Sequence, residues 1–137
     1  MCGIIHKMMQ SVLTIEQATN LSALTLAYVG DAVQTLYVRQ TLATNHDYKP
    51  ENLHRLAVQK EKCSWQANVA DRVEQSLSPQ ELDVFHRGRN AKTSHQPKNG
   101  TVGDYRKATG FEAVLGWLYL TGQKQRLYEL LGELNVD

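Results

Sequence analysis

Apolar residues recur at spacings of three and four along most of the chain, which is the period of an amphipathic α-helix. The pattern begins at Leu21 and runs without a strong break to Val38. The same period predicts further helices over about residues 50–77, interrupted or bent near the middle, over 79–88 and 104–121, and through Leu127, Leu130, Leu131 and Leu134. No segment alternates in the manner of a strand. The pattern therefore predicts an all-α protein with five to seven helices.

Local signals mark where two of these elements begin and end. Ser78, Pro79 and Glu81 combine an N-cap, a proline at the first helical position and the acid of a capping box. Residues 90–103 contain two glycines, a proline and several serine, threonine and asparagine residues. This composition predicts a long loop, and loops of such length in small domains are usually functional or disordered.

Length and composition limit the class of protein. With 137 residues, the chain fits one domain, predicted over 21–137, after a loosely specified and flexible lead-in over 1–20. The net charge of +1 excludes a general polycation, so nucleic acid would have to bind through a local patch. Two cysteines give neither a disulfide framework nor a closed zinc site. The chain shows no secretory signal and no uncharged run long enough to span a membrane, so we expect a cytoplasmic protein.

Two apolar runs each contain a single charged residue, and both are carboxylates. Leu21 to Val38 contains only Asp31, and Ala108 to Leu120 contains only Glu112. An acid within an apolar helix must be paired, protonated or bound to a cation, because burying a bare carboxylate is costly. The two acids are therefore candidate ligands of one metal ion.

Small residues accompany both acids, namely Gly30, Ala32, Ala113 and Gly116. They would let the two helices approach closely and bring the carboxylates together. Glycine is a poor helix residue, so its presence beside Asp31 indicates that another backbone or a ligand comes near. Carboxylate oxygens favour Mg²⁺ or Mn²⁺ over zinc. The alternative, which the sequence leaves open, is that each acid is solvated at a helix edge or bonded to an arginine or tyrosine.

Basic residues concentrate just before the second acid. Six Lys and Arg residues lie in the segment from Arg87 to Lys107, and only Asp104 opposes them. Arginine presents a fork that fits phosphate oxygens, and asparagine adds hydrogen bonds. The segment is therefore a candidate contact for a phosphodiester backbone, although charge clusters are more often simply solvated surface.

The two acidic segments resemble motifs of the ribonuclease III family. Tyr28-Val29-Gly30-Asp31-Ala32-Val33 resembles the central part of its signature, and Phe111-Glu112-Ala113-Val114-Leu115-Gly116 resembles its second acidic motif. Their separation of about 80 residues fits one catalytic domain. Four further segments resemble the Mini-ribonuclease III branch, which lacks an appended double-stranded-RNA-binding domain: Leu53-His54-Arg55, the block from Arg87 to Lys92, Pro97-Lys98-Asn99 and Tyr105-Arg106. The resemblance covers about residues 21–134.

This resemblance implies a ribonuclease III-like helical bundle that acts as a symmetric homodimer. It implies Mg²⁺-dependent hydrolysis of double-stranded RNA, with Mn²⁺ as a substitute, to leave 5′-phosphate and 3′-hydroxyl ends. The implied substrate is precursor 23S ribosomal RNA. Asp31 and Glu112 would be the catalytic and metal-binding residues. The residues expected to contact RNA are Arg55, Arg87, Arg89, Asn90, Lys92, Lys98 and Arg106.

Two positions depart from the family pattern. Ala27 and Thr109 stand where ribonuclease III proteins have further acids, so the expected metal site is poorer in carboxylates and a tightly held pair of metal ions is not predicted. Glu51 and Asp104 are left open as contributors through water. Two other hypotheses also stay open: a non-catalytic RNA-binding or ribosome-assembly protein with this fold, and an interaction module whose acids pair with arginines across a dimer interface.

Overall fold

The computed structural model describes residues 12–45, 49–60, 63–92 and 101–136. Within these ranges the chain forms seven α-helices and one 3₁₀ helix, with no strand, so the all-α prediction is confirmed. None of the described helices is long and apolar enough to cross a bilayer. The elements are α2 (Ile15–Thr19), α3 (Ala23–Asn45), α4 (Pro50–Lys60), α5 (Cys63–Val73), η1 (Glu74–Ser76), α6 (Pro79–Asn90), α7 (Val102–Leu120) and α8 (Lys124–Gly132).

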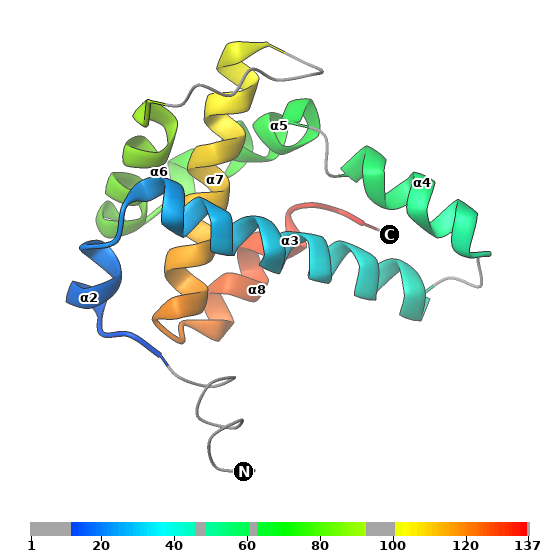
Figure 1. The fold of residues 1–137 in the computed structure, drawn as a ribbon, viewed down its shortest axis with the longest axis horizontal. Coiled ribbons are helices and arrows are strands. Elements are labelled where there is room, and N and C mark those ends of the chain that lie inside the picture. Colours follow the sequence, from blue (N-terminus) through cyan, green and yellow to red (C-terminus); the bar gives the residue numbers. More distant parts are fainter. Residues whose placement is uncertain (1–11, 46–48, 61–62, 93–100, 137) are drawn as a thin grey trace.

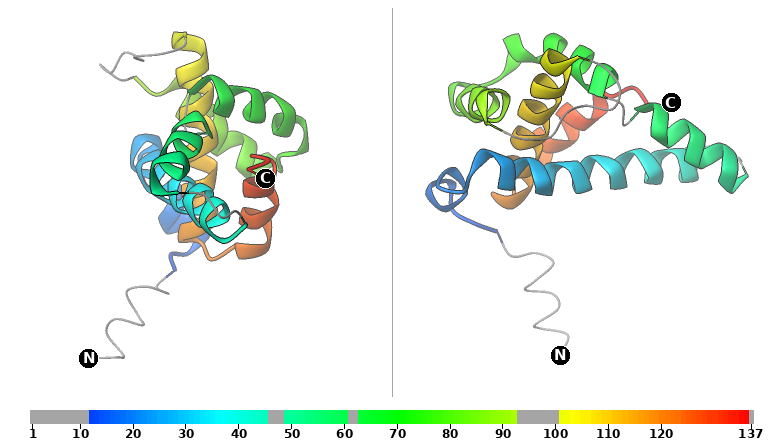
Figure 2. Two further views of the ribbon diagram at one scale, coloured as in Figure 1. Left: turned by 90° about the vertical axis from the view of Figure 1, so that its right-hand side faces the viewer. Right: turned by 45° about the horizontal axis from the view of Figure 1, so that its top comes forward.

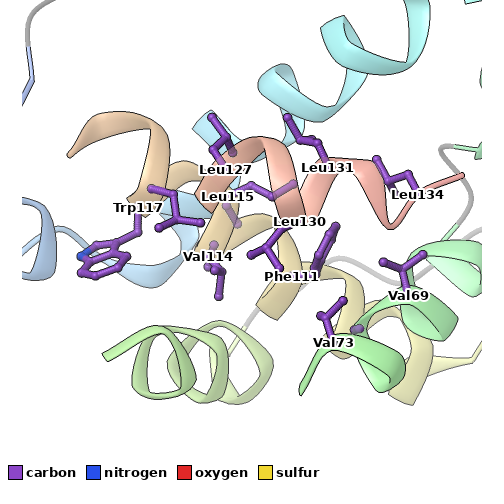
Figure 3. Packing of buried hydrophobic residues seen from close by; sticks show 14 of the residues in the cluster. Val69, Val73, Phe111, Val114, Leu115, Trp117, Leu127, Leu130, Leu131 and Leu134 are labelled. Carbon is purple, nitrogen blue, oxygen red and sulfur yellow. The ribbon is translucent and has the colours of Figure 1, made fainter. Parts of the chain in front are cut away.

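Helix α7 is the centre of the bundle, and α3 crosses it (Figure 1). Helices α5, α6 and α8 also pack against α7. Its middle is buried on all sides, from Ala108 to Leu118 apart from the partly buried Glu112. Figure 3 shows Phe111 and Leu115 of α7 packed among side chains of α5 and α8 such as Val69 and Leu130. A helix that is apolar all round is buried in this way, which explains the unbroken apolar run in the sequence.

The capping signals predicted at residue 78 are confirmed. The Ser78 hydroxyl accepts from the Glu81 backbone N–H at 3.2 Å, and the Ser78 N–H donates to the Glu81 carboxylate at 2.9 Å. The predicted interruption within residues 50–77 is also observed, because α4 ends at Lys60 and α5 begins at Cys63. The boundaries of α6 and α7 leave residues 91–101 between them, within the predicted long loop.

The second half of the predicted lead-in packs against the bundle. Thr14 and Gln17 form a capping box for α2, and Ala18 is fully buried. The Trp117 indole N–H donates to the Thr19 hydroxyl at 3.2 Å. Helix α2 thus lies against one end of the bundle, while α4 lies at the far end of α3 (Figure 2). Residues 1–11 of the lead-in lie outside the described residues.

Candidate metal centre and nucleic-acid interface

Two glycines bring α3 and α7 into direct backbone contact. A Cβ on Gly30 would lie 1.7 Å from the carbonyl oxygen of Glu112, and a Cβ on Gly116 would lie 1.9 Å from that of Leu26. Neither position can carry any side chain, because a real carbon cannot approach an oxygen so closely. The sequence prediction of a close approach at Gly30 is therefore confirmed, and the approaching partner is the backbone of the second acidic helix.

This crossing places the two acids together. Asp31 is exposed, whereas Glu112 is partly buried and its carboxyl is hydrogen-bonded to that of Asp31. Burial raises the pKa of Glu112 well above the ordinary glutamate value, and the hydrogen bond and the charge of Asp31 raise it further. Two carboxyl groups in contact must share a proton or a cation. The pair therefore has the chemistry of a divalent-cation site, with oxygen ligands from two helices.

The other small residues do not act as predicted. Ala32 is exposed and lies away from the crossing. Ala113 faces α6, where a Cβ on Gly88 would lie 3.0 Å from its methyl carbon. A second close contact joins those helices, since a Cβ on Gly110 would lie 2.7 Å from the Phe85 carbonyl oxygen. Small residues on α7 thus serve two neighbours, because a central helix must be approached from several sides.

The positions that depart from the family pattern hold no ligand. Ala27 and Thr109 are both buried, and the Thr109 hydroxyl donates to the Tyr105 carbonyl oxygen at 2.9 Å. Across the described ranges, no three His, Cys, Asp or Glu side chains are close enough to hold one ion. Glu51 and Asp104 therefore do not complete a three-residue group. Among the described residues, the acids that meet at this crossing are Asp31 and Glu112, and a divalent cation held by two carboxylates takes its other ligands from water or substrate oxygens.

The Arg87 side chain is hydrogen-bonded to the backbone of another part of the fold. Its guanidinium donates to the Thr19 carbonyl oxygen at 3.0 Å and to the Leu21 carbonyl oxygen at 2.8 Å, which closes the turn between α2 and α3. These carbonyls would otherwise be unsatisfied at the end of α2. Arg87 is therefore engaged by the fold itself, and we do not include it among the proposed RNA contacts.

The remaining predicted RNA contacts lie mostly at the surface. Arg55, Asn90, Lys92 and Arg106 are exposed, and Arg89 is half-exposed, 3.7 Å from Glu74. The neighbouring Lys107, by contrast, is paired with Asp71 at 2.9 Å. Lys98 lies outside the described residues.

Two features escaped the sequence prediction. Gln34, three residues after Asp31, is fully buried with neither amide atom hydrogen-bonded. Large apolar side chains also lie exposed around hollows between α3, α7 and α8: Tyr28, Leu36, Tyr119 and Tyr128. A signal for this surface was present, because the run from Leu21 to Val38 is apolar on more faces than one neighbouring helix covers.

Comparison with known proteins assigns the chain to a family. Residues 24–123 match the model of the ribonuclease III domain. A Mini-ribonuclease 3 of a Thermoanaerobacter species is 43% identical over 126 residues, which cover 92% of this chain and 88% of the relative. A Mini-ribonuclease 3 of Desulfitobacterium hafniense is 49% identical over 107 residues, covering 78% and 68%. A crystal structure of a Fusobacterium nucleatum protein superposes with a TM-score of 0.76 at 26% identity, over 82% of this chain and 90% of that one.

These matches span the α3–α7 crossing, both acidic motifs and the basic segment between them. The chain therefore belongs to the ribonuclease III family of double-stranded-RNA endoribonucleases, and within it to the Mini-ribonuclease 3 branch.

Proposed function

We propose that Asp31 and Glu112 are the metal-binding and catalytic residues of this endoribonuclease, and that they hold Mg²⁺, with Mn²⁺ as a substitute. The observation that carries this proposal is the contact between the two carboxyl groups at a backbone-to-backbone helix crossing. A cation there would replace the proton that the pair otherwise shares. When bound, the ion would neutralise charge on the scissile phosphate and lower the pKa of the attacking water.

The contact between α3 and α7 orients the two carboxylates relative to each other. The Gly30–Glu112 backbone contact fixes the spacing between α3 and α7, so the two carboxylates cannot drift apart. Glu112 is partly buried and held by the central helix, whereas Asp31 is exposed and faces the solvent from which RNA would approach. We propose that hydrolysis breaks the bond between phosphorus and the 3′ oxygen, leaving a 5′-phosphate and a 3′-hydroxyl.

We propose that duplex RNA is held through its backbone by Arg55, Arg89, Asn90, Lys92 and Arg106, with Lys98 from the segment between α6 and α7. Arg55, Asn90, Lys92 and Arg106 are exposed and Arg89 is half-exposed, which supports the assignment. Side chains of these types read phosphates and 2′-hydroxyls rather than base sequence. The proposed substrate is precursor 23S ribosomal RNA in the cytoplasm, for which the support is the Mini-ribonuclease 3 resemblance.

We further propose that the enzyme is a homodimer that pairs through the exposed apolar surface of α3. Tyr28 is 80% exposed and borders a hollow of about 430 Å³ that Asp31 also lines. A second hollow of about 210 Å³ continues beside α8. Contiguous apolar surface of this kind marks an interaction site. A two-fold axis there would set two acidic sites side by side, one for each strand of a duplex.

Cleavage of a duplex RNA labelled at the 5′ end, titrated with Mg²⁺ or Mn²⁺, tests the proposed function. We expect Asp31→Asn and Glu112→Gln to lower the cleavage rate by about a thousandfold, because metal assistance contributes several kcal/mol. Both variants should keep duplex binding, measured by filter retention without metal. Tight binding without metal-dependent cleavage by the wild type would instead support a non-catalytic RNA-binding protein. Unfolding or dissociation of both variants would support an interaction module.

A further inference from the structure

Gln34 is an unusual residue in the core of this protein. It is 0% exposed, and both its Oε1 and its Nε2 lack a hydrogen-bond partner. Among the residues that the structure describes, no other side chain has buried polar atoms in this condition. Burial of an unpaired amide costs free energy comparable to that of a lost hydrogen bond, so such a group calls for an explanation in its surroundings.

The position of Gln34 on α3 relates it to the proposed metal site. It follows Gly30 by four residues and Asp31 by three, so all three share one side of the helix. At about 100° per residue, the direction of Gln34 from the helix axis falls between those of Gly30 and Asp31. Gly30 faces the backbone of Glu112, and Asp31 contacts its carboxyl group. Gln34 thus lies one turn along α3, on the side that Glu112 faces.

The two carboxyl groups of Asp31 and Glu112 give a reason for an unpaired amide at position 34. The Glu112 carboxyl lies against that of Asp31 at the helix crossing, so a donor on the same side of α3 could reach the same group. A carboxylate that binds a cation through one lone pair keeps further lone pairs that can accept hydrogen bonds. Metal-ligating carboxylates are normally held in position by hydrogen bonds from neighbouring groups. Across the described ranges, no arginine or lysine is ion-paired with either acid.

We propose that Gln34 is a positioning residue of the metal centre, whose amide Nε2 donates a hydrogen bond, directly or through one water, to the Glu112 carboxylate when a divalent cation is bound. The inference rests on the proposed role of Asp31 and Glu112 and goes beyond it. It assigns a function to a polar side chain that contributes no hydrogen bond to the folded core. Gln34 does not touch the cation or the substrate in this scheme.

The first test measures Mn²⁺ affinity without RNA, by electron paramagnetic resonance of free Mn²⁺, together with the melting temperature in EDTA. We expect Gln34→Met to weaken Mn²⁺ binding about tenfold or more, the usual effect of removing such a supporting contact. Its melting temperature should be unchanged or higher, since an unpaired amide has been removed. The exposed Gln59→Met on α4 is the matched control and should change neither quantity.

The second measurement needs no substitution and applies even if Gln34→Met fails to fold. In the wild-type protein, the side-chain N–H resonances of Gln34 should shift when Mg²⁺ is added, and those of Gln59 should not. Resonances of Gln34 that stay fixed while Asp31 and Glu112 signals respond would overturn the inference.

The outcomes separate this inference from the proposed function. Wild-type Mn²⁺ binding that Asp31→Asn abolishes, combined with unchanged affinity in Gln34→Met, rejects the positioning role alone. Absence of Mn²⁺ binding by the wild type rejects both proposals. If Gln34 had only a structural role, Gln34→Met would change the melting temperature and leave Mn²⁺ affinity unchanged. This result also counts against the inference.

Discussion

Gly30 of α3 lies so close to Glu112 of α7 that a single added carbon would stand 1.7 Å from the Glu112 carbonyl oxygen. The residue after Gly30 is the first acid of the candidate metal site, and Glu112 is the second. The contact that packs the bundle is thus the same contact that aligns the two carboxyl groups. Stability and site geometry depend here on one pair of residues.

Gly30→Ala should therefore unfold the protein or destabilise it by more than about 3 kcal/mol, since overpacking against rigid backbone cannot be relieved by a rotamer change. Chemical denaturation monitored by circular dichroism measures this. Gly132→Ala is the matched control, because a Cβ at that helical position meets nothing within 4 Å. It should leave stability unchanged or raise it by about 0.5–1 kcal/mol. Equal effects of the two substitutions would contradict the backbone contact.

Glu112 should make the metal-free protein less stable as pH rises. Its pKa is raised in the folded state, chiefly by burial. The stabilising contribution of the protonated carboxyl is fully present below the ordinary glutamate pKa and is lost as pH rises through the folded-state value. Glu112→Gln, a neutral side chain of the same shape, should remove this part of the pH dependence.

Melting temperatures in EDTA, recorded for both proteins between acidic and mildly alkaline pH, test this prediction. The wild-type curve should fall relative to the Glu112→Gln curve as pH increases. Added Mg²⁺ should recover the wild-type loss at high pH and leave the variant unaffected. Parallel curves in EDTA would show that the Glu112 carboxyl is not held in the protonated form.

Two ion pairs of this protein should differ sharply in their contributions to the free energy of unfolding. Glu81 is buried and accepts from Arg126 Nε at 3.1 Å, while Lys107 and Asp71 pair at 2.9 Å on the surface. Arg126→Met leaves the Glu81 carboxylate buried without its partner and should cost about 3 kcal/mol. Lys107→Met should change stability by less than about 1 kcal/mol. Urea denaturation compares them, and similar losses would show that the Glu81 pair is solvated.

The basic residues between α6 and α7 and at the ends of these helices should differ in role, some stabilising the fold and others binding RNA. Arg87→Ala removes two hydrogen bonds to backbone carbonyls and should destabilise the fold by about 2 kcal/mol. Arg106→Ala and Lys92→Ala should leave the melting temperature unchanged and weaken duplex RNA binding. Each should also reduce the salt dependence of binding by about one unit in the log–log slope. An Arg106→Ala protein with wild-type RNA affinity would remove this residue from the proposed interface.

Tyr28→Asp should dissociate the proposed homodimer. Tyr28 is a large exposed side chain, and replacing such a residue at the centre of an interface by a charged one typically costs about 2 kcal/mol or more of binding free energy. This corresponds to about a thirtyfold increase in the dimer dissociation constant. Light scattering coupled to size-exclusion chromatography measures the mass. Val102→Asp, an exposed apolar residue at the start of α7, is the control and should keep the wild-type mass. A wild type that is monomeric at all concentrations would contradict the proposal.

Some features of this protein follow from the sequence alone. Helical periodicity and the Ser78–Glu81 capping box gave correct elements, because those signals act between residues three or four apart and need no distant partner. The lone acids Asp31 and Glu112 also indicated a candidate site from the sequence alone. An unpaired carboxyl in an apolar helix is costly wherever the helix packs. Gly30 and Gly116 indicated a close approach of the two acidic helices, although not which backbone atoms would meet.

The tertiary structure decided which residues meet. Arg87 binds carbonyls more than 60 positions earlier in the chain, and no local pattern distinguishes it from Arg106, which stays exposed. Ala113 and Gly116 read alike in the sequence, yet one faces α6 and the other α3, because a central helix is approached from several directions. Gln34 is unremarkable until its burial is known. Long-range packing fixes these assignments, since each depends on the rotation and crossing of whole helices rather than on the residues next to them.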